Sequence, residues 1–372
     1  MRFSEMQSAV LFIAVLIITL MMTFIFYPRL VAKKRNGMIL VKIGENKFSI
    51  RNNIPFITSA FVIPIGWHIL FSRRALFVGT DTYNYYVDYT GLDKFNFEVG
   101  YRWWVTFCNW IGMDFSTFLF VSSLVILFFL FAGLRNYLDN ALSMMVALSI
   151  YYFEFFFTSM NVFRQMFAVA IFFYAVNYLI DKQVKKYIIF IFLASTFHFS
   201  ALMTLAFIPI SYFERGRNRN KQLYYYLFLL LFLTIGPVGL IFVNNLFSLG
   251  YNLEFQQFGI GFFKDYFIPM LLIFFVKLKR RKMETKELRV LENLFLMVIP
   301  IRVLGYSSTT ISRLSFYPSI IQVILVPLIL SKVQSKKTKY VTSVLIVILY
   351  AAIYFVVKRN SGEVFPFAFS AE

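Results

Sequence analysis

Long apolar runs separated by short polar segments dominate this chain. The runs lie at about residues 6–27, 54–72, 115–134, 141–157, 163–180, 187–213, 223–246, 262–277, 290–305, 313–331 and 340–357. Most are long enough for a helix to cross the hydrocarbon core of a bilayer, which takes about 20 residues. Their apolar residues are continuous rather than alternating, which favours helices over a membrane barrel. The pattern predicts an all-α, polytopic integral membrane protein with about 11 membrane segments, forming a single domain over residues 1–372.

The composition supports a membrane location. Of the 372 residues, 59% are hydrophobic and 20% are aromatic, which is more apolar surface than a soluble domain can bury. The first run is too long for the core of a signal peptide and lacks a convincing cleavage site of small residues. We therefore interpret it as a membrane span.

Positive charge concentrates in five short segments. Lys and Arg number 37 against 18 Asp and Glu, which gives a formal net charge of +19. The segments 29–51, 181–186, 214–221, 277–289 and 332–339 hold 25 of the 37 cations. Cations clustered in short loops orient a membrane protein, and this placement argues against nucleic acid as a partner. We expect all five segments to face the cytoplasm and the N-terminus, residues 73–114 and the tail from 358 to face outward.

The run 187–213 conflicts with this orientation if it crosses the membrane once. It lies between two basic segments, 181–186 and 214–221, that the positive-inside rule places on the same side. His198 stands near its middle, and a membrane helix broken at a polar residue usually lines a cavity. We therefore predict a broken, re-entrant hairpin, with a single long crossing as the alternative.

Residues 73–114 form the one large outer segment. It carries five acidic residues and is rich in tyrosine, and three tryptophans lie near its end, at positions 103, 104 and 110. Aromatic side chains of this kind gather at the membrane–water interface. The segment is therefore expected to lie at the interface, with an amphipathic helix near its end.

Cationic and polar side chains converge on the predicted outer face. They are Arg73, Arg74, Arg164, Arg302 and Arg313, with Gln165 beside Arg164 and His198 at the centre of the predicted hairpin. Guanidinium groups bind phosphate oxygens bidentately and keep their charge, so this pattern indicates an anionic ligand. The alternatives are that the arginines anchor helices at the interface and that His198 is a buried histidine bonded to a nearby serine.

The outer segment adds candidates of the opposite charge. Asp81 could accept a proton or cap a helix, and Glu98 could belong to a site or form a plain salt bridge with Arg102 at i, i+4. Tyr83 and Tyr101 could stack on sugar rings or sit at the interface. Cys108 is the one cysteine, and the chain has only two histidines, so it offers no intramolecular disulfide and no Cys/His metal cluster.

Five stretches, taken in order, resemble a known family of membrane enzymes. They are GTDTYNYYVDY (79–89), FEVGYRWW (97–104), NVFRQMFAVAIFFYAVNYLIDKQVKKY (161–187), ASTFHFSALM (194–203) and SRLSFYPSI (312–320), with VFPFAF in the tail. The ordered set resembles the EpsG-like branch of the Wzy-type polysaccharide polymerases, over roughly residues 73–320.

The resemblance implies a bacterial inner-membrane glycosyltransferase, for which a GT-C-like arrangement is conceivable. Such enzymes join oligosaccharide units carried on undecaprenyl pyrophosphate at the outer face of the membrane, and they use neither a nucleotide sugar nor a cofactor. Membrane lipids and a chain-length regulator are the further partners to expect.

This chemistry gives the candidate residues roles. Arg164 and Arg313 would stabilise the departing diphosphate, with Arg73, Arg74 and Arg302 in support. His198 or Asp81, or as a third choice Glu98, would act on the attacking hydroxyl. Two other readings share these features: an O-antigen-type ligase or other lipid-linked sugar transferase, and a polysaccharide flippase. Ligases usually carry a larger outer loop than this one, and flippases tend to show repeated halves, which this sequence lacks.

Overall fold

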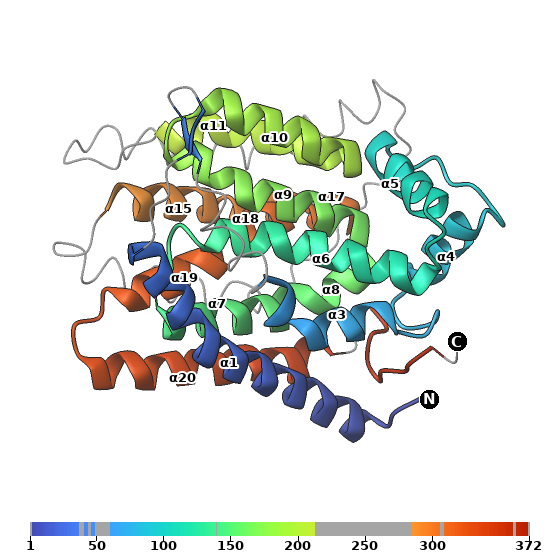
Figure 1. Cartoon of the computed structure of the whole chain (residues 1–372), viewed down its shortest axis with the longest axis horizontal. Helices are drawn as coiled ribbons and strands as arrows, with labels where there is room; N and C mark the ends of the chain where they lie inside the picture. The colour runs from blue at the N-terminus through green and yellow to red at the C-terminus, as the bar shows by residue number, and fades with distance from the viewer. Residues whose placement is uncertain are drawn as a thin grey trace.

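The computed structural model describes residues 2–36, 41–43, 46–48, 60–138, 140–212, 285–305, 309–359 and 362–370. The expected spans at 223–246 and 262–277 and the basic segment 214–221 lie outside these residues. Within them, every regular element is helical apart from a two-stranded antiparallel ribbon of β1 (Val41–Ile43) and β2 (Asn46–Phe48) (Figure 1). This confirms the all-α prediction for the part of the chain that the structure describes.

Six of the described helical segments are long and apolar enough to cross a membrane. They are the first part of α1 (Glu5–Asn36), α6 (Phe115–Leu134), α7 (Ala141–Tyr151) continued by the π-helix η1 (Tyr152–Phe156) and α8 (Phe157–Asn161), α9 (Phe163–Ile180), the segment Ile311–Ser331, and α20 (Lys336–Ile353) continued by the π-helix η4 (Tyr354–Lys358). The segment Ile311–Ser331 contains the end of α17 (Thr309–Arg313), α18 (Phe316–Ser319) and α19 (Gln322–Ser331).

Two of the other predicted spans give shorter helices. The run 54–72 contributes α3 (Ile65–Ser72), and the run 290–305 is divided between α15 (Lys286–Leu296) and α16 (Val298–Gly305). The total of about 11 membrane segments therefore stays a prediction.

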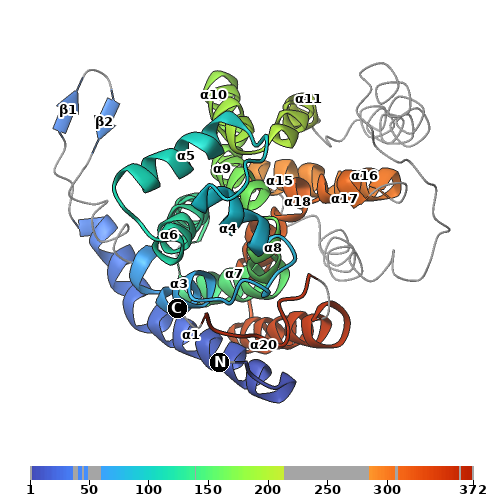
Figure 2. The ribbon, with the colours of Figure 1, turned by 90° about the vertical axis from the view of Figure 1, so that its right-hand side faces the viewer.

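Helix α9 forms the centre of the bundle and packs between α6 and α10 (Val184–Phe197) (Figure 2). Fifteen of its 18 residues are buried, as suits a helix that is apolar on nearly all sides. Helices α1 and α20 lie at the margin instead, and each exposes a row of large apolar side chains. These faces are suited to contact with lipid.

The run 187–213 forms a hairpin, as its position between two basic segments predicts. Helix α10 ends at Phe197, His198 is extended, and the chain returns through the 3-10 helix η2 (Phe199–Ala206) and α11 (Phe207–Tyr212). The Lys182 ammonium, just before α10, donates to the Ser211 carbonyl at 2.5 Å, close to the end of α11. The part of this run that the structure describes, up to Tyr212, therefore starts and finishes at the same end of the bundle, as the predicted hairpin requires.

The basic segments that the structure describes gather at that same end. A cavity of about 450 Å³ is lined by residues from three of them or their borders, including Asp181, Glu287 and Lys332. The segments 181–186, 285–289 and 332–339 therefore share one end of the bundle, which we expect to be cytoplasmic. Helices α4 (Thr82–Thr90) and α5 (Val99–Trp110) lie at the opposite end, as do both ends of the chain (Figure 1).

The tail, residues 362–370, closes that opposite end. The Phe3 N–H donates to the Phe367 carbonyl at 3.0 Å, and the Ala75 N–H donates to the Ala368 carbonyl at 2.9 Å. The Phe367 side chain is fully buried. The tail thus fastens the beginning of the chain to the start of the outer segment.

Replacing the buried tail ring should destabilise the protein. In soluble proteins, truncating a buried phenylalanine to alanine costs about 3–5 kcal/mol. We expect Phe367→Ala to lower the apparent melting temperature of the detergent-purified protein, measured by size-exclusion chromatography after heating. The exposed Ser370→Ala is the matched control, and equal melting of the two variants would contradict this role for the tail.

The orientation can be tested by cysteine labelling in a Cys108→Ser background. A membrane-impermeant maleimide should label Asp93→Cys in intact cells, because Asp93 is exposed in the outer segment. It should label Lys185→Cys and Lys337→Cys only after permeabilisation. The reverse pattern would place the basic segments outside and overturn the assignment.

Candidate functional site

Arg164 lies at the beginning of α9, where the chain changes direction. Helix α8 ends at Asn161, Val162 leaves the helical conformation, and α9 starts at Phe163. This places a cation in the first helical turn, where the helix dipole disfavours positive charge. The Arg164 side chain is only 18% exposed. A nearby counter-charge is therefore needed to hold it in this position.

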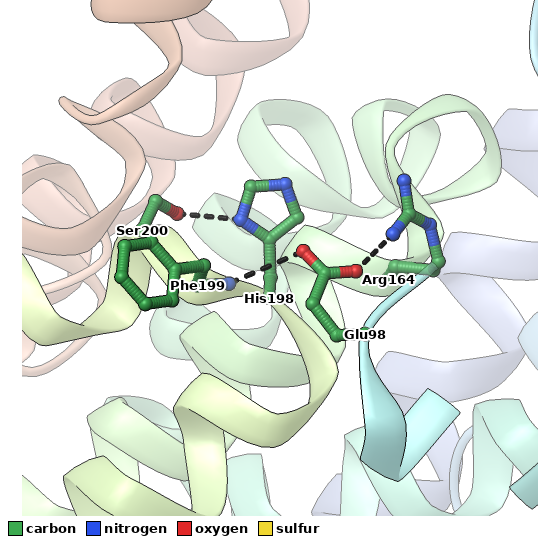
Figure 3. A network of polar contacts seen from close by, with 5 residues as sticks. All are labelled: Glu98, Arg164, His198, Phe199 and Ser200. Carbon is green, nitrogen blue, oxygen red and sulfur yellow. Dashed lines mark hydrogen bonds and ion pairs between the residues drawn. The ribbon is translucent and has the colours of Figure 1, made fainter. Parts of the chain in front are cut away.

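Glu98 supplies that counter-charge. It directly precedes α5, and its carboxylate forms an ion pair with the Arg164 guanidinium (Figure 3). Its second oxygen accepts a hydrogen bond from the Phe199 N–H at 3.2 Å. One carboxylate thus joins the outer helix α5, the buried helix α9 and the tip of the hairpin.

His198 stands at the break between α10 and η2. Its Nδ1 lies 2.7 Å from the Ser200 hydroxyl (Figure 3), which lies 2.9 Å from the Tyr317 hydroxyl on α18. The Tyr317 ring is fully buried. This chain of polar contacts ties the hairpin tip to the span Ile311–Ser331.

Arg313 reaches the same region from α17. The buried side-chain amide of Gln165 donates to the Arg313 carbonyl at 3.0 Å, which fixes the end of α17 beside the first turn of α9. The Arg313 side chain itself is exposed. The pair predicted to hold a diphosphate, Arg164 and Arg313, therefore comes from neighbouring elements at one end of the bundle.

The electrostatics keep the imidazole neutral. His198 lies outside the six candidate spans, and burial lowers its pKa from 6.5 to about 4. The Glu98 carboxylate raises this pKa, while the positive charges of Arg164 and Arg313 lower it. At neutral pH the imidazole therefore carries no charge and has one ring nitrogen that can accept a proton.

Aromatic rings surround the Arg164 guanidinium. Its central carbon lies 3.8 Å from the centre of the Phe97 ring and 5.6 Å from that of Tyr101, distances at which cation–π attraction operates. The Arg164 charge also acts on the hydroxyl of Tyr85, whose pKa is raised chiefly by burial. Tyr101 is fully buried, so its ring packs below the arginine and is not presented to a sugar.

Arg74 does not face this cluster. Its guanidinium is buried, donates to the Thr82 hydroxyl at 3.1 Å and to the Met160 carbonyl at 3.2 Å, and also bonds the Phe71 carbonyl. All of these acceptors belong to the protein. In this structure Arg74 joins the outer segment to α8.

The structure also locates four other predicted residues. Tyr83 is exposed on α4 and Arg102 on α5, and Arg73 is exposed at the start of the outer segment. Arg302 is half-buried on α16. The structure therefore leaves their predicted substrate contacts as predictions.

Asp81 lies at the edge of the cluster. It precedes α4, where its carboxylate accepts a hydrogen bond from the Thr80 hydroxyl at 3.3 Å. Its charge acts on Tyr85, and no direct contact with His198 or Arg164 is present among the described residues. This separates the two residues predicted as alternative bases.

Four residues that the structure adds to the cluster carry weaker signals in the sequence. Ser200, two positions after His198, is one of the nearby serines that could bond a buried histidine. Tyr317 lies in the stretch SRLSFYPSI, but nothing in that stretch singles out its ring. Phe97 and Tyr85 lay within an aromatic segment that offered no way to single them out.

The arrangement can bind an anion and accept a proton. It presents two guanidinium groups, one carboxylate and one neutral imidazole. Within the described residues, no group of three or more His, Cys, Asp or Glu side chains is placed to hold a metal ion.

A protein-family model described as the EpsG family matches residues 58–369. Among curated proteins and solved structures, no match was found. The matched range includes every residue of the network in Figure 3.

The lowered pKa of His198 predicts a pH dependence of stability. Below its unfolded pKa of 6.5 the unfolded chain binds a proton that the folded protein does not, so stability falls as the pH drops from about 6.5 to about 4. His198→Asn should lose this component, while His68 contributes equally to both proteins. Unfolding midpoints measured between pH 4 and 8 should therefore diverge only below pH 6.5; parallel curves would contradict a neutral buried imidazole.

Proposed function

Because the chain belongs to the EpsG family, we propose that it is a membrane glycosyltransferase that polymerises polysaccharide repeat units. Membership of this family implies a role in polysaccharide biosynthesis. The proposed substrates are oligosaccharides carried on undecaprenyl pyrophosphate, joined at the outer face of a bacterial inner membrane. The observation that carries the proposal is the meeting of Arg164 and Arg313 with Glu98 and His198 at the end of the bundle opposite the basic segments.

The reaction exchanges one bond at the anomeric carbon for another. A hydroxyl oxygen of the acceptor sugar attacks C1 of the donor sugar, and the bond from C1 to the diphosphate oxygen breaks. The bonding electrons leave with the lipid diphosphate, on which negative charge therefore develops. Arg164 and Arg313 are placed to stabilise that charge, which is the role expected of fixed cations in a partly desolvated site.

The attacking hydroxyl must lose its proton. His198 can take it at Nε2 in the tautomer whose Nδ1–H donates to the Ser200 hydroxyl. A pKa near 4 makes a weak base, but an anionic diphosphate beside the imidazole would raise that pKa by offsetting the two arginines. Glu98 is the alternative base, provided that the diphosphate takes over the Arg164 guanidinium and frees the carboxylate. Asp81, which lies farther from the arginines, becomes the third choice.

Glu98 and the diphosphate would compete for the same guanidinium. In the structure described here, the carboxylate pairs with Arg164 and so compensates a partly buried positive charge. Binding of the donor would exchange one anion for another at the Arg164 guanidinium. The arrangement thus prepares the arginine for an anionic ligand.

Removing the Arg164 charge should suppress polymerisation. We expect Arg164→Ala to lower the rate by about 10²–10³-fold, as for the loss of other transition-state donors, and Arg164→Lys to recover only part of it because a bidentate contact is lost. The assay incubates purified protein with a synthetic lipid-linked repeat unit and follows the product ladder. Single units should accumulate in the variant.

Arg359→Ala is the matched control. Arg359 is an outward cation that pairs with Glu5 at 3.4 Å and is 41% exposed, so its loss should leave the ladder intact. An unchanged ladder in well-folded Arg164→Ala would overturn the role of Arg164. Transfer to a different lipid acceptor would point to a ligase, and movement of the lipid-linked unit without new bonds would point to a flippase.

A further inference from the structure

An apolar groove runs between α5 and α10 at the outer end of the molecule. It has a volume of about 560 Å³. One wall is formed by Val99, Trp103, Trp104 and Phe107, and the other by Leu193 and Phe197. The groove therefore lies between the amphipathic outer helix and the first arm of the hairpin.

The two helices meet at a glycine. A Cβ atom on Gly100 would lie 2.7 Å from the Thr196 Cβ and 2.8 Å from its carbonyl oxygen, closer than side chains pack. Glycine thus allows α5 to approach α10 and form the floor of the groove. A larger residue there would have to push the walls apart.

Two polar groups along the groove have partners within the protein. The Thr196 hydroxyl donates to the Leu193 carbonyl at 2.8 Å, and the Trp104 indole N–H donates to the Ser122 hydroxyl at 2.9 Å. The groove therefore offers a ligand little besides apolar contact, which suits a hydrocarbon better than a sugar.

One end of the groove adjoins the polar network. Val99 directly follows Glu98, and Phe197 directly precedes His198. The Phe197 ring stacks on Phe167 of α9 at 4.2 Å, which holds this end rigidly against the central helix. A ligand could therefore extend from the arginines directly into the groove.

Toward its other end the outer helix carries an aromatic surface. Trp103 is 76% exposed and Trp110 79% exposed, which suits the membrane–water interface. The groove thus connects a cationic site to the region where lipid chains begin.

We propose that this groove binds the first isoprene units of a polyprenyl diphosphate, with its diphosphate held by Arg164 and Arg313. The inference rests on the proposed function and adds where the lipid lies and how it enters. The ligand has an anionic head joined to a branched apolar chain, and the structure presents a cationic site joined to an apolar groove. The lipid enters sideways from the outer leaflet, between α5 and α10.

Photolabelling tests the site without requiring catalysis. The probe is a sugar-free polyprenyl diphosphate with a diazirine on the isoprene units next to the diphosphate, added to the full chain in lipid nanodiscs. Mass spectrometry should place the label on residues lining α5 and α10 of the wild-type protein. Labelling elsewhere in the chain overturns the proposal.

Filling the groove should exclude the probe. Leu193→Trp adds bulk to one wall and Val99→Trp to the other, and each should reduce labelling at least tenfold. Phe192→Trp is the matched control, because Phe192 is an exposed apolar residue next in sequence that does not line the groove. Equal labelling of the three variants contradicts the proposal.

Competition identifies the occupant. Excess undecaprenyl phosphate should suppress the labelling, whereas excess phosphatidylglycerol should leave it unchanged. Equal suppression by both would show a surface that takes any lipid, which overturns the proposal.

The two proposals fail in different ways. A normal product ladder from Leu193→Trp would reject the groove as the donor site while leaving the polymerase intact. Groove labelling by the wild-type protein, together with failure to form a ladder, would support the lipid site while rejecting the polymerase.

Discussion

The ion pair between Glu98 and Arg164 is the interaction on which this end of the molecule depends. An arginine in the first turn of a helix opposes the helix dipole, and partial burial removes much of the water that would otherwise stabilise it. The carboxylate pairs with one terminal nitrogen of the guanidinium and balances its charge, and its second oxygen accepts a hydrogen bond from the Phe199 N–H. Three segments that are far apart in sequence are thereby joined by one side chain, and the imidazole of His198 is brought beside two cations.

The same contacts explain why the site is both rigid and open to exchange. The buried residues Gln165 and Tyr317 fix neighbouring elements through hydrogen bonds, so the backbone around the arginines has little freedom. The ion pair, by contrast, is partly exposed, and an incoming anion could replace the carboxylate without reorganising the helices. An exchangeable ion pair set among fixed hydrogen bonds is consistent with a preorganised anion site.

The sequence predicted the hairpin and the principal members of the cluster, because both follow from local constraints. Two basic segments separated by one apolar run with a central histidine leave few alternatives to a hairpin. Arginines at the ends of spans are visible in the pattern of hydrophobic and polar residues. The partner of Arg164 could not be predicted: Glu98 is equally well spaced for Arg102, and tertiary packing alone decides between them. The adjacent Arg73 and Arg74 are indistinguishable in the sequence for the same reason, because burial of Arg74 depends on distant acceptors such as the Met160 carbonyl. Contacts such as that of Ser200 with Tyr317, 117 residues away, leave no periodic signal.

The docked tail has a consequence for the order in which the molecule is completed during biosynthesis. Residues 362–370 are translated after every element that they fasten, and they follow α20, so they reach their position only once this last described span has been inserted. Until then, the beginning of the chain and the start of the outer segment lack the tail segment that bridges them. A nascent chain halted before this point would keep its central helices but would have an unsealed outer rim, which quality-control proteases in the membrane could recognise.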